Sequence, residues 1–181
     1  MNNKFIFKII DISFRLTILC VVSAMLLSWV YKETKPKIEE NIKKEIETAQ
    51  KDVLPGAVSF QEKESGKKKY VEGYDANGNS VGKIFVLSER GYGSEIKMMV
   101  GVNNGKIVGI KVIQHTETPG LGDGITKKNF LNQFIDKSLN QLLLKKDGGE
   151  IEAITGATIS SKACIKIAKE ALEYGKQSEQ Q

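Results

Sequence analysis

The stretch that decides the fold is residues 95–114, EIKMMVGVNNGKIVGIKVIQ. In its first half, apolar side chains occupy every second position: Ile96, Met98, Val100 and Val102. This period places them on one face of a strand. The Asn-Asn-Gly sequence then turns the chain into a second run rich in valine and isoleucine, at 106–114. The pattern predicts a β-hairpin.

The rest of the chain adds strands before this hairpin and helices after it. Residues 69–74 and 81–87 are typical of two further strands, separated by the turn-rich sequence DANGN at 75–79. Loops this short favour antiparallel pairing. Apolar residues at every third or fourth position predict helices at 126–135 and 162–175. The expected fold class is therefore α+β, an antiparallel sheet flanked by helices.

The C-terminal helix has recognisable end signals. Ser160 or Ser161 is expected to be its N-cap, and Gly175 is expected to end it. Cys164 lies on the apolar stripe of this helix and is interpreted as a small buried hydrophobe rather than a reactive thiol. The last six residues, KQSEQQ, are expected to fray.

An apolar run near the N-terminus predicts a membrane anchor. Residues 16–31, LTILCVVSAMLLSWVY, include 13 apolar residues and span roughly 24 Å as a helix, slightly short of a bilayer core. Three alternatives fit less well. The run has no polar face, which a soluble core helix would have, and no convincing A-x-A site follows it, which a cleaved signal peptide would have. The residues before Cys20 are also bulkier than those of a lipoprotein signal. The expectation is an uncleaved single-pass anchor in the cytoplasmic membrane. Lys4, Lys8 and Arg15 favour a cytoplasmic N-terminus, which puts the soluble domain on the extracytoplasmic side.

Composition bounds what the remaining chain does. It has 181 residues, of which 40% are hydrophobic and 27% charged, enough for one domain and a short attachment. The net charge is +5, but residues 1–32 carry four bases and one acid, so the other 149 residues carry only +2. That balance does not indicate a basic surface for binding nucleic acid.

The counts of histidine and cysteine limit the possible metal sites. One histidine and two cysteines exclude a multi-histidine metal site, a zinc ribbon and an iron–sulfur cluster bound within one chain. Redox chemistry here needs an organic cofactor.

The expected organisation has four parts: an anchor at 1–32, a linking amphipathic helix at 33–54, a domain at 55–175 and a tail at 176–181. The linking helix is predicted from an apolar stripe that ends before Pro55-Gly56 and consists of Ile38, Ile42, Ile46, Ala49 and Val53.

Two segments are candidates for chemistry. The first is ITGATISS at 154–161, where small and hydroxyl residues lead directly into a helix. A helix N-terminus with free N–H groups favours a phosphate. On composition alone, an ordinary strand-to-helix turn with a serine cap is the favoured explanation of the same residues. The segment is not a P-loop, because GxxxxGK[ST] is absent.

The second segment is HTETPGLG at 115–122, a glycine-rich loop that follows a strand. Such a loop presents backbone amides to a planar or anionic ligand. His115 is either a hydrogen-bonding group, a general base or a structural residue at a strand end. A metal site made of His115, Glu117 and Asp123 is a further alternative. No CxxC motif is present.

Together the two segments resemble the FMN-binding domain family. Thr155-Gly-Ala-Thr158 resembles its [S/T]GAT flavinylation motif, and residues 115–122 resemble its H-x-E-T-P-G-L-G loop. VLPGA at 53–57 and GYGSEIK at 91–97 also fit the family. With the anchor and the length, the chain is similar to the G subunits of Rnf ion-translocating electron transport complexes. It is short for the homologous C subunits of the sodium-pumping NADH:quinone reductase.

The resemblance implies an FMN that is joined through its phosphate to the hydroxyl of Thr158. It implies no catalytic residue and no metal ligand. Glu152 stands where the family motif usually has aspartate, which keeps the charge and lengthens its reach. The cofactor-binding residues that the resemblance implies are Thr158, Thr155, Gly156, Ala157, Ser160, Ser161, His115, Glu117, Thr118, Pro119, Gly120, Leu121 and Gly122.

The function that the resemblance implies is that of an electron-transfer subunit in a membrane-bound, ion-translocating ferredoxin:NAD oxidoreductase. The implied partners are the other membrane subunits and a flavin transferase for maturation; alone, the chain is not expected to be an enzyme. No GxGxxG follows a strand, so NAD itself is not an expected ligand. Two alternatives stay open: a stand-alone, membrane-anchored extracytoplasmic flavoprotein carrier, and a cofactor-free envelope domain that binds a ligand or partner.

Overall fold

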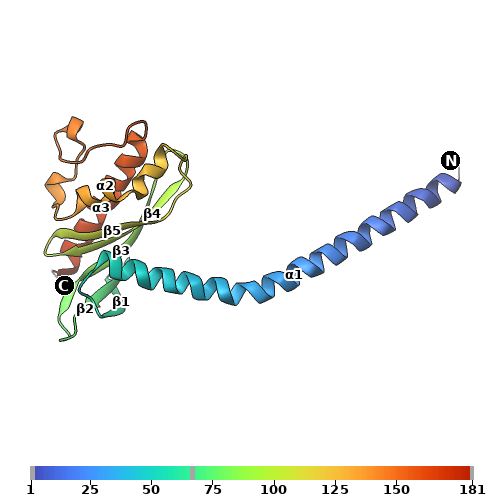
Figure 1. Cartoon of the computed structure of the whole chain (residues 1–181), viewed down its shortest axis with the longest axis horizontal. Helices are drawn as coiled ribbons and strands as arrows, with labels where there is room; N and C mark the ends of the chain where they lie inside the picture. The colour runs from blue at the N-terminus through green and yellow to red at the C-terminus, as the bar shows by residue number, and fades with distance from the viewer. Residues whose placement is uncertain (1–2, 66–67, 180–181) are drawn as a thin grey trace. The chain divides into compact units, whose positions relative to one another are not determined.

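The computed structural model describes residues 3–65 and 68–179 (Figure 1). The chain forms two units, Met1–Ile46 and Glu47–Gln181, which are considered separately. Helix α1 (Asn3–Val53) is continuous, so the predicted anchor and linking helix form one element, with Pro36 inside it. Among the described residues it is the one helix that is long and apolar enough to cross a membrane, with a mean hydropathy of 1.8 in its most apolar window.

Five strands within the described residues form one antiparallel sheet in sequence order, β1-β2-β3-β4-β5. The predicted hairpin is confirmed as β4 and β5, and Asn104 and Gly105 between them both have positive φ, at 49° and 70°. Positive φ at both central residues is typical of a two-residue type I′ turn, which matches the twist of the strands. The bounds are β1 Ser59–Ser65, β2 Lys68–Tyr74, β3 Ser80–Arg90, β4 Glu95–Asn103 and β5 Lys106–Gln114.

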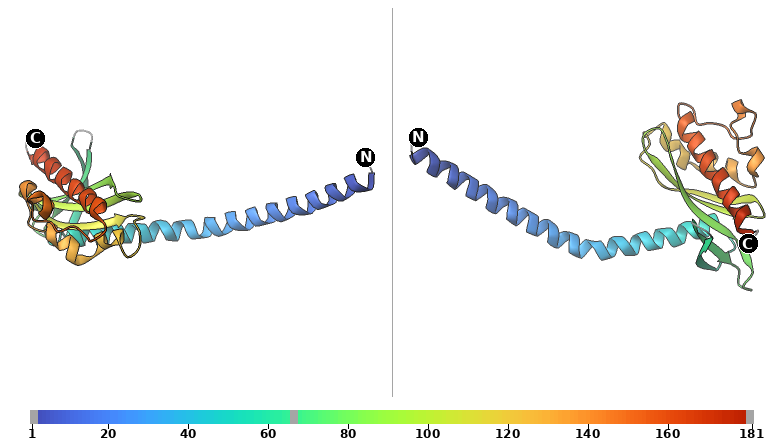
Figure 2. Two further views of the ribbon diagram at one scale, coloured as in Figure 1. Left: turned by 90° about the horizontal axis from the view of Figure 1, so that it is seen from above. Right: turned by 180° about the vertical axis from the view of Figure 1, so that it is seen from behind.

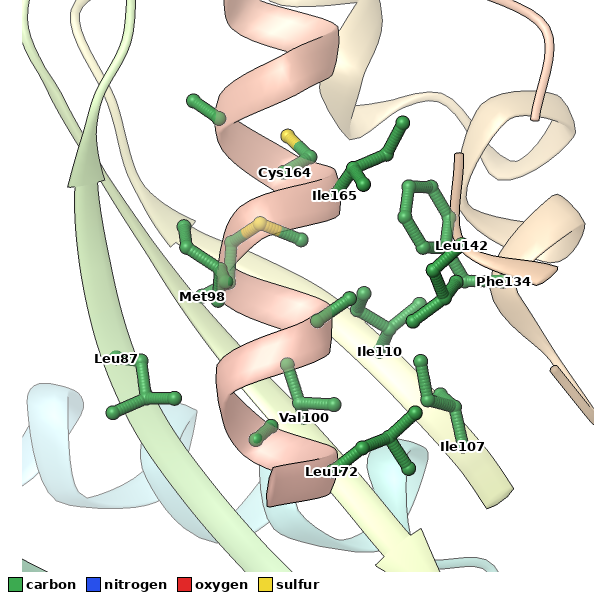
Figure 3. Packing of buried hydrophobic residues seen from close by; sticks show 14 of the residues in the cluster. Leu87, Met98, Val100, Ile107, Ile110, Phe134, Leu142, Cys164, Ile165 and Leu172 are labelled. Carbon is green, nitrogen blue, oxygen red and sulfur yellow. The ribbon is translucent and has the colours of Figure 1, made fainter. Parts of the chain in front are cut away.

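One face of the sheet is covered by α3 (Thr158–Glu179), as Figures 1 and 2 show. Because strand side chains alternate between faces, the even-numbered residues of β4 all point toward this helix. Figure 3 shows Met98 and Val100 of β4 beside Cys164 and Leu172 of α3. The main core lies in this layer.

The other face is covered by the last turns of α1, where Ala49 and Val53 are buried. Gly101 and Gly109 are cross-strand partners under this helix end. A Cβ on Gly109 would lie 2.0 Å from the Val53 carbonyl oxygen, and one on Gly101 would lie 2.6 Å from it. Glycine is therefore needed at both positions, because the helix backbone rests directly on the strands.

Short elements connect β5 to α3 and close the end of the main core. They place Phe130, Phe134, Leu142 and Leu144 in it. The elements are the 3₁₀ turns η1 (Gly122–Thr126), η2 (Asn132–Phe134), η3 (Leu139–Gln141) and η4 (Lys145–Asp147), and the helix α2 (Lys128–Leu131).

The two edges of the sheet differ. On the β5 edge, the Asp136 amide donates to the Ile107 carbonyl (2.8 Å) and the Ile107 amide donates to the Lys137 carbonyl (3.2 Å). The other edge is β1, whose sequence SFQEKES is mostly polar.

The structure corrects the expectations for the first strand and for both ends of the C-terminal helix. Strand β1 was not predicted, because a polar edge strand lacks the apolar alternation that marks a strand. Helix α3 begins at Thr158, four residues before the predicted start, so Ser160 and Ser161 lie in its first turn and neither is the N-cap. The helix also continues past Gly175, so residues 176–179 of the tail that was expected to fray are helical, and residues 180–181 lie outside the described residues. Its last turn is held because the Lys83 ammonium donates to the Ser178 carbonyl (3.0 Å) and hydroxyl (2.8 Å).

Candidate functional site

The two segments singled out in the sequence lie together at the N-terminal end of α3. The loop after β5 and the turn before α3 form the walls of a pocket of about 420 Å³. The turn between β3 and β4 completes it. The lining residues are Tyr92, Glu117, Thr118, Leu121, Gly122, Gly156, Ala157, Thr158, Ile159 and Ser160.

The start of α3 is fixed by a local turn. Gly156 has a φ of +77°, a left-handed conformation that glycine adopts without steric cost. The Ala157 amide then donates to the Ile154 carbonyl (2.9 Å). The Ser161 hydroxyl accepts from the Ile154 amide (3.1 Å) and donates to the Ala157 carbonyl (2.9 Å). The Ser161 hydroxyl thus holds the turn both as a donor and as an acceptor.

Thr158 is the first residue of this 22-residue helix and is half-buried in the pocket wall. The first amides of a helix have no acceptor within the helix, and together with its dipole they favour a negative charge. The hydroxyl of Thr158 therefore lies where an anion is favoured.

Glu117 provides the buried charge of the pocket and is only 5% exposed. Its Oε1 accepts from the amides of Gly93 (3.1 Å) and Ser94 (3.2 Å), and its Oε2 accepts from the Ser160 hydroxyl (2.6 Å). Burial raises the pKa of this carboxyl, but the bonds from Ser160, Gly93 and Ser94 outweigh burial and hold the pKa below its usual 4.5. Glu117 is therefore an anion at neutral pH.

Two glycines make room for this carboxylate. A Cβ on Gly91 would lie 2.4 Å from Glu117 Oε1, and one on Gly122 would lie 2.8 Å from Oε2. Both separations are shorter than any normal contact, so a side chain at either position would displace the carboxylate. The backbone is shaped around Glu117 from two sides.

The rim of the pocket is apolar and exposed to solvent. Tyr92 is 72% exposed, Ile159 54% and Leu121 49%. A soluble surface rarely groups large apolar side chains around a cavity without a ligand or partner. Leu121 also contacts the turn before α3, because a Cβ on Gly156 would lie 3.0 Å from its Cδ2. The apolar rim, the glycine-lined wall and the helix N-terminus together suit a planar aromatic ligand that carries a phosphate.

A second pocket of about 530 Å³ lies on the other side of Leu121. It includes Thr155, Gly120 and Glu152. The backbone of Glu152 is held by the Gln133 side chain, whose oxygen accepts from its amide (2.7 Å). The Glu152 carboxylate points to Lys145 at 3.2 Å.

The structure distributes the thirteen residues of the expected cofactor site unequally. Eight line the first pocket: Glu117, Thr118, Leu121, Gly122, Gly156, Ala157, Thr158 and Ser160. Thr155 and Gly120 line the second. His115, Pro119 and Ser161 line neither; the His115 Nδ1 accepts from the Glu117 amide at 3.3 Å, a bond within its own loop.

Two lining residues, Tyr92 and Ile159, were not among the expected site residues. Tyr92 stands between Gly91 and Gly93 in the sequence, and glycines on both sides of an aromatic residue leave its ring exposed. That pattern was the signal that could have identified Tyr92. Ile159 interrupts the polar start of α3, and its position becomes informative only once the helix is known to begin at Thr158.

The hypothesised metal ligands and the thiol of Cys164 have the following surroundings. Among the described residues, no cluster of three His, Cys, Asp or Glu side chains has the arrangement of a metal site. Both oxygens of Glu117, one of the hypothesised metal ligands, accept hydrogen bonds. Cys164 is fully buried, as predicted; burial, and then the charge of Glu117, raises the pKa of its thiol to about 12.

Comparison with known proteins gives the family. The model of the FMN-binding domain matches residues 91–173. The chain is 31% identical over 169 residues to the G subunit of an ion-translocating oxidoreductase complex of Methanosarcina acetivorans, covering 88% of this chain and 90% of the relative. It is 34% identical over 170 residues to the G subunit of a proton-translocating ferredoxin:NAD(+) oxidoreductase complex of Clostridium ljungdahlii, covering 92% and 91%.

Among solved structures, the crystal structure of Shewanella oneidensis NqrC aligns with a TM-score of 0.49 and 20% identity over 67% of this chain and 68% of that one. The relatives from Methanosarcina and Clostridium are matched over nearly their full length. The chain therefore belongs to the FMN-binding domain family, within the group formed by the G subunits of ion-translocating oxidoreductase complexes.

Proposed function

We propose that this chain is an electron-transfer subunit of a membrane-bound, ion-translocating ferredoxin:NAD oxidoreductase of the Rnf type, and that it carries FMN covalently on Thr158. The observation that carries the proposal is the position of Thr158. Its hydroxyl belongs to the first residue of α3, in the wall of a pocket with an exposed apolar rim. Bound FMN would supply the electron-carrying chemistry, and the protein would supply position and electrostatics.

The residues present fit the two halves of FMN differently. The phosphate half suits the first turn of α3, where the amides of Thr158, Ile159 and Ser160 start the helix. Glu117 bonds to the Ser160 hydroxyl and to amides outside α3, so it leaves the helix amides available. The ring half suits Tyr92 and Leu121, whose exposed apolar surfaces would be covered by a planar ligand.

Covalent attachment is proposed at Thr158 because two threonines line the pocket and only one stands at the helix N-terminus. Thr118, the other, lies in the glycine loop. A tether prevents loss of the cofactor outside the cell and keeps it bound when its affinity changes with oxidation state. Maturation then requires a flavin transferase, which would act on the exposed turn around Thr155 and Gly156.

Membrane attachment follows the same proposal. The apolar N-terminal part of α1 would be the single-pass anchor. The domain would lie on the extracytoplasmic side, with the other subunits of the complex as partners. In the proposed organisation, residues 1–32 are the anchor, 33–54 the linking helix, 55–175 the FMN-binding domain and 176–181 the tail.

The experiment is intact mass spectrometry of the denatured full chain after co-expression with a flavin transferase. Wild type is expected to gain the mass of one FMN less one water. Thr158→Ala is expected to gain nothing, and Thr118→Ala, the matched control, is expected to keep the adduct. An unmodified wild type, beside a control substrate that the same transferase does modify, would overturn the covalent proposal and favour the cofactor-free alternative.

A second experiment separates a complex subunit from a stand-alone carrier. Affinity purification of the tagged, flavin-loaded chain from membranes of its native host is expected to recover the other subunits of the complex. Recovery of the loaded chain alone, under conditions that keep a known membrane complex intact, would favour the stand-alone flavoprotein.

A further inference from the structure

We infer that Glu117 is the positioning residue that assembles this pocket: its one buried carboxylate fixes the Gly91–Ser94 turn, and with it the ring of Tyr92, against the first turn of α3. The inference rests on the proposed function only where it names the occupant as a flavin. The assembly of the pocket is a property of the chain itself.

The carboxylate joins parts of the chain that are far apart in sequence. Its oxygens accept from Gly93 and Ser94, 24 and 23 residues before it, and from Ser160, 43 residues after it. Ser160 is fully buried and its hydroxyl is directed at Glu117. All three walls of the pocket therefore meet at one side chain.

The turn that carries Tyr92 depends on this carboxylate. Two consecutive amides of the turn donate to the same oxygen, Oε1. The Gly91 amide closes the turn on the Ser94 carbonyl (2.7 Å), and the Ser94 hydroxyl accepts from the Thr116 amide (2.9 Å). Tyr92 lines the pocket and is 72% exposed, so the backbone of this turn largely determines where its side chain stands.

The charge at this position has a consequence for a bound flavin. Buried charges act over a low-dielectric path, and an anion beside an electron acceptor makes reduction less favourable. Neutralising Glu117 is therefore expected to raise the midpoint potential of the flavin. A residue that only stabilises the fold would not change that potential.

Glu72 is a matched control. It is also a buried carboxylate (9% exposed) with three side-chain partners: Lys63, Tyr74 and Ser80. None of these residues lines the Thr158 pocket. Glu72→Ala and Glu72→Gln therefore report what the loss of a buried carboxylate does to this fold away from the pocket.

The first experiment needs no flavin. Hydrogen–deuterium exchange is measured on the full chain in detergent micelles, expressed without a transferase. Glu117→Ala is expected to speed exchange of the Gly93 and Ser94 amides at least about tenfold, because each loses a charged acceptor. Glu72→Ala is expected to leave these amides unchanged. Unchanged exchange in Glu117→Ala, or equal acceleration in both variants, would overturn the inference.

The second experiment uses protein whose flavin loading has been verified by mass. Glu117→Gln keeps the shape: its amide oxygen can accept from both backbone amides, and the Ser160 hydroxyl can turn to accept from its NH₂. Its midpoint potential is expected to be higher than that of wild type, with Glu72→Gln unchanged. Equal potentials in wild type and Glu117→Gln would overturn the electrostatic part. If wild type carries no flavin, the proposed function fails, and the exchange experiment still decides whether Glu117 assembles the pocket.

Discussion

A buried carboxylate lies near each end of α3, and the two carboxylates have different partners. At the N-terminal end, the donors to Glu117 among the described residues are amides and a hydroxyl. At the C-terminal end, a pocket that includes Gly175 contains Glu72, which is paired with the Lys63 ammonium at 2.5 Å. Lys83 adds a second cation there, bound to the Ser178 carbonyl of the last turn.

This difference follows the direction of the helix dipole. The positive N-terminal end favours an anion beside neutral donors, whereas a carboxylate near the negative C-terminal end is paired with a lysine. A second anion, such as a phosphate, is therefore favoured at the end where Thr158 lies.

The largest expected difference between the two ends is in the loss of unfolding free energy when a serine at each end is replaced by alanine. Ser160→Ala leaves a buried, charged Glu117 oxygen without its donor and is expected to cost about 1.5–3 kcal/mol of unfolding free energy. Ser178→Ala removes a half-buried hydroxyl whose lysine partner can be solvated, and is expected to cost less than about 1 kcal/mol. Thermal unfolding of the full chain in detergent measures both. Equal costs would mean that the ends are not distinct.

Acid is the next test, because both carboxyls have lowered pKa values. Burial raises the pKa of Glu72, but its bonds to Lys63, Ser80 and Tyr74 outweigh burial and hold the pKa below 4.5. The pKa of Glu117 is lowered in the same way by its own hydrogen-bond donors. A lowered folded pKa stabilises the fold above the unfolded pKa, about 4.5, and this stabilisation is lost as pH falls through the folded value. Stability measured against pH is expected to fall below about pH 4.5 in wild type and to fall less in Glu117→Gln and in Glu72→Gln. If stability below pH 4.5 fell as steeply in both variants as in wild type, this expectation would be wrong.

Salt should then separate the two ends. The Lys63–Glu72 pair is partly exposed, at 42% and 12%, so screening in 1 M salt is expected to reduce its contribution to the unfolding free energy. Glu117 has neutral donors, so the cost of Glu117→Gln is expected to stay constant with salt. The measurement is the difference in unfolding free energy between each variant and wild type at low and high salt. A salt-dependent cost at Glu117 would reveal a cation acting on the N-terminal end of α3.

The smallest expected effect is at Cys164, in the second turn of α3. Its buried thiol has a pKa raised to about 12, so a maleimide is expected to leave it unmodified in the folded chain and to modify it only on unfolding. A Cys20→Ser background removes the other thiol. Modification without unfolding would show that the N-terminal end of α3 opens in solution.

Sequence predicted the parts of the fold that local patterns determine. The hairpin at 95–114 combines apolar alternation with Asn-Gly at the turn, and the structure confirms it. Strand β1 has neither signal, because it lies at a polar edge and is defined mainly by its pairing with β2. The start of α3 was misplaced because Ser160 and Ser161, which look like caps, bond instead to Glu117 and to the turn before the helix.

The site was predicted in the same partial way. Both segments that form the pocket were identified, because glycine-rich and hydroxyl-rich sequences stand out locally. The direction of the Glu117 side chain did not stand out, since its partners lie 23 to 43 residues away. Tyr92 was missed for the same reason: only the folded turn places it at the pocket.

The two edges of the sheet affect whether the domain can pair, strand to strand, with other protein molecules. Proteins carried on a membrane meet one another in two dimensions, where an open strand invites addition of a strand from a second molecule. The backbone bonds from Asp136 and Lys137 occupy part of the β5 edge, and charged residues at 62–64 fill the β1 edge. Both borders thus discourage intermolecular sheet growth, one by covering the backbone and the other by charge. Encounters with other molecules are left to side-chain surfaces such as the rim around Thr158.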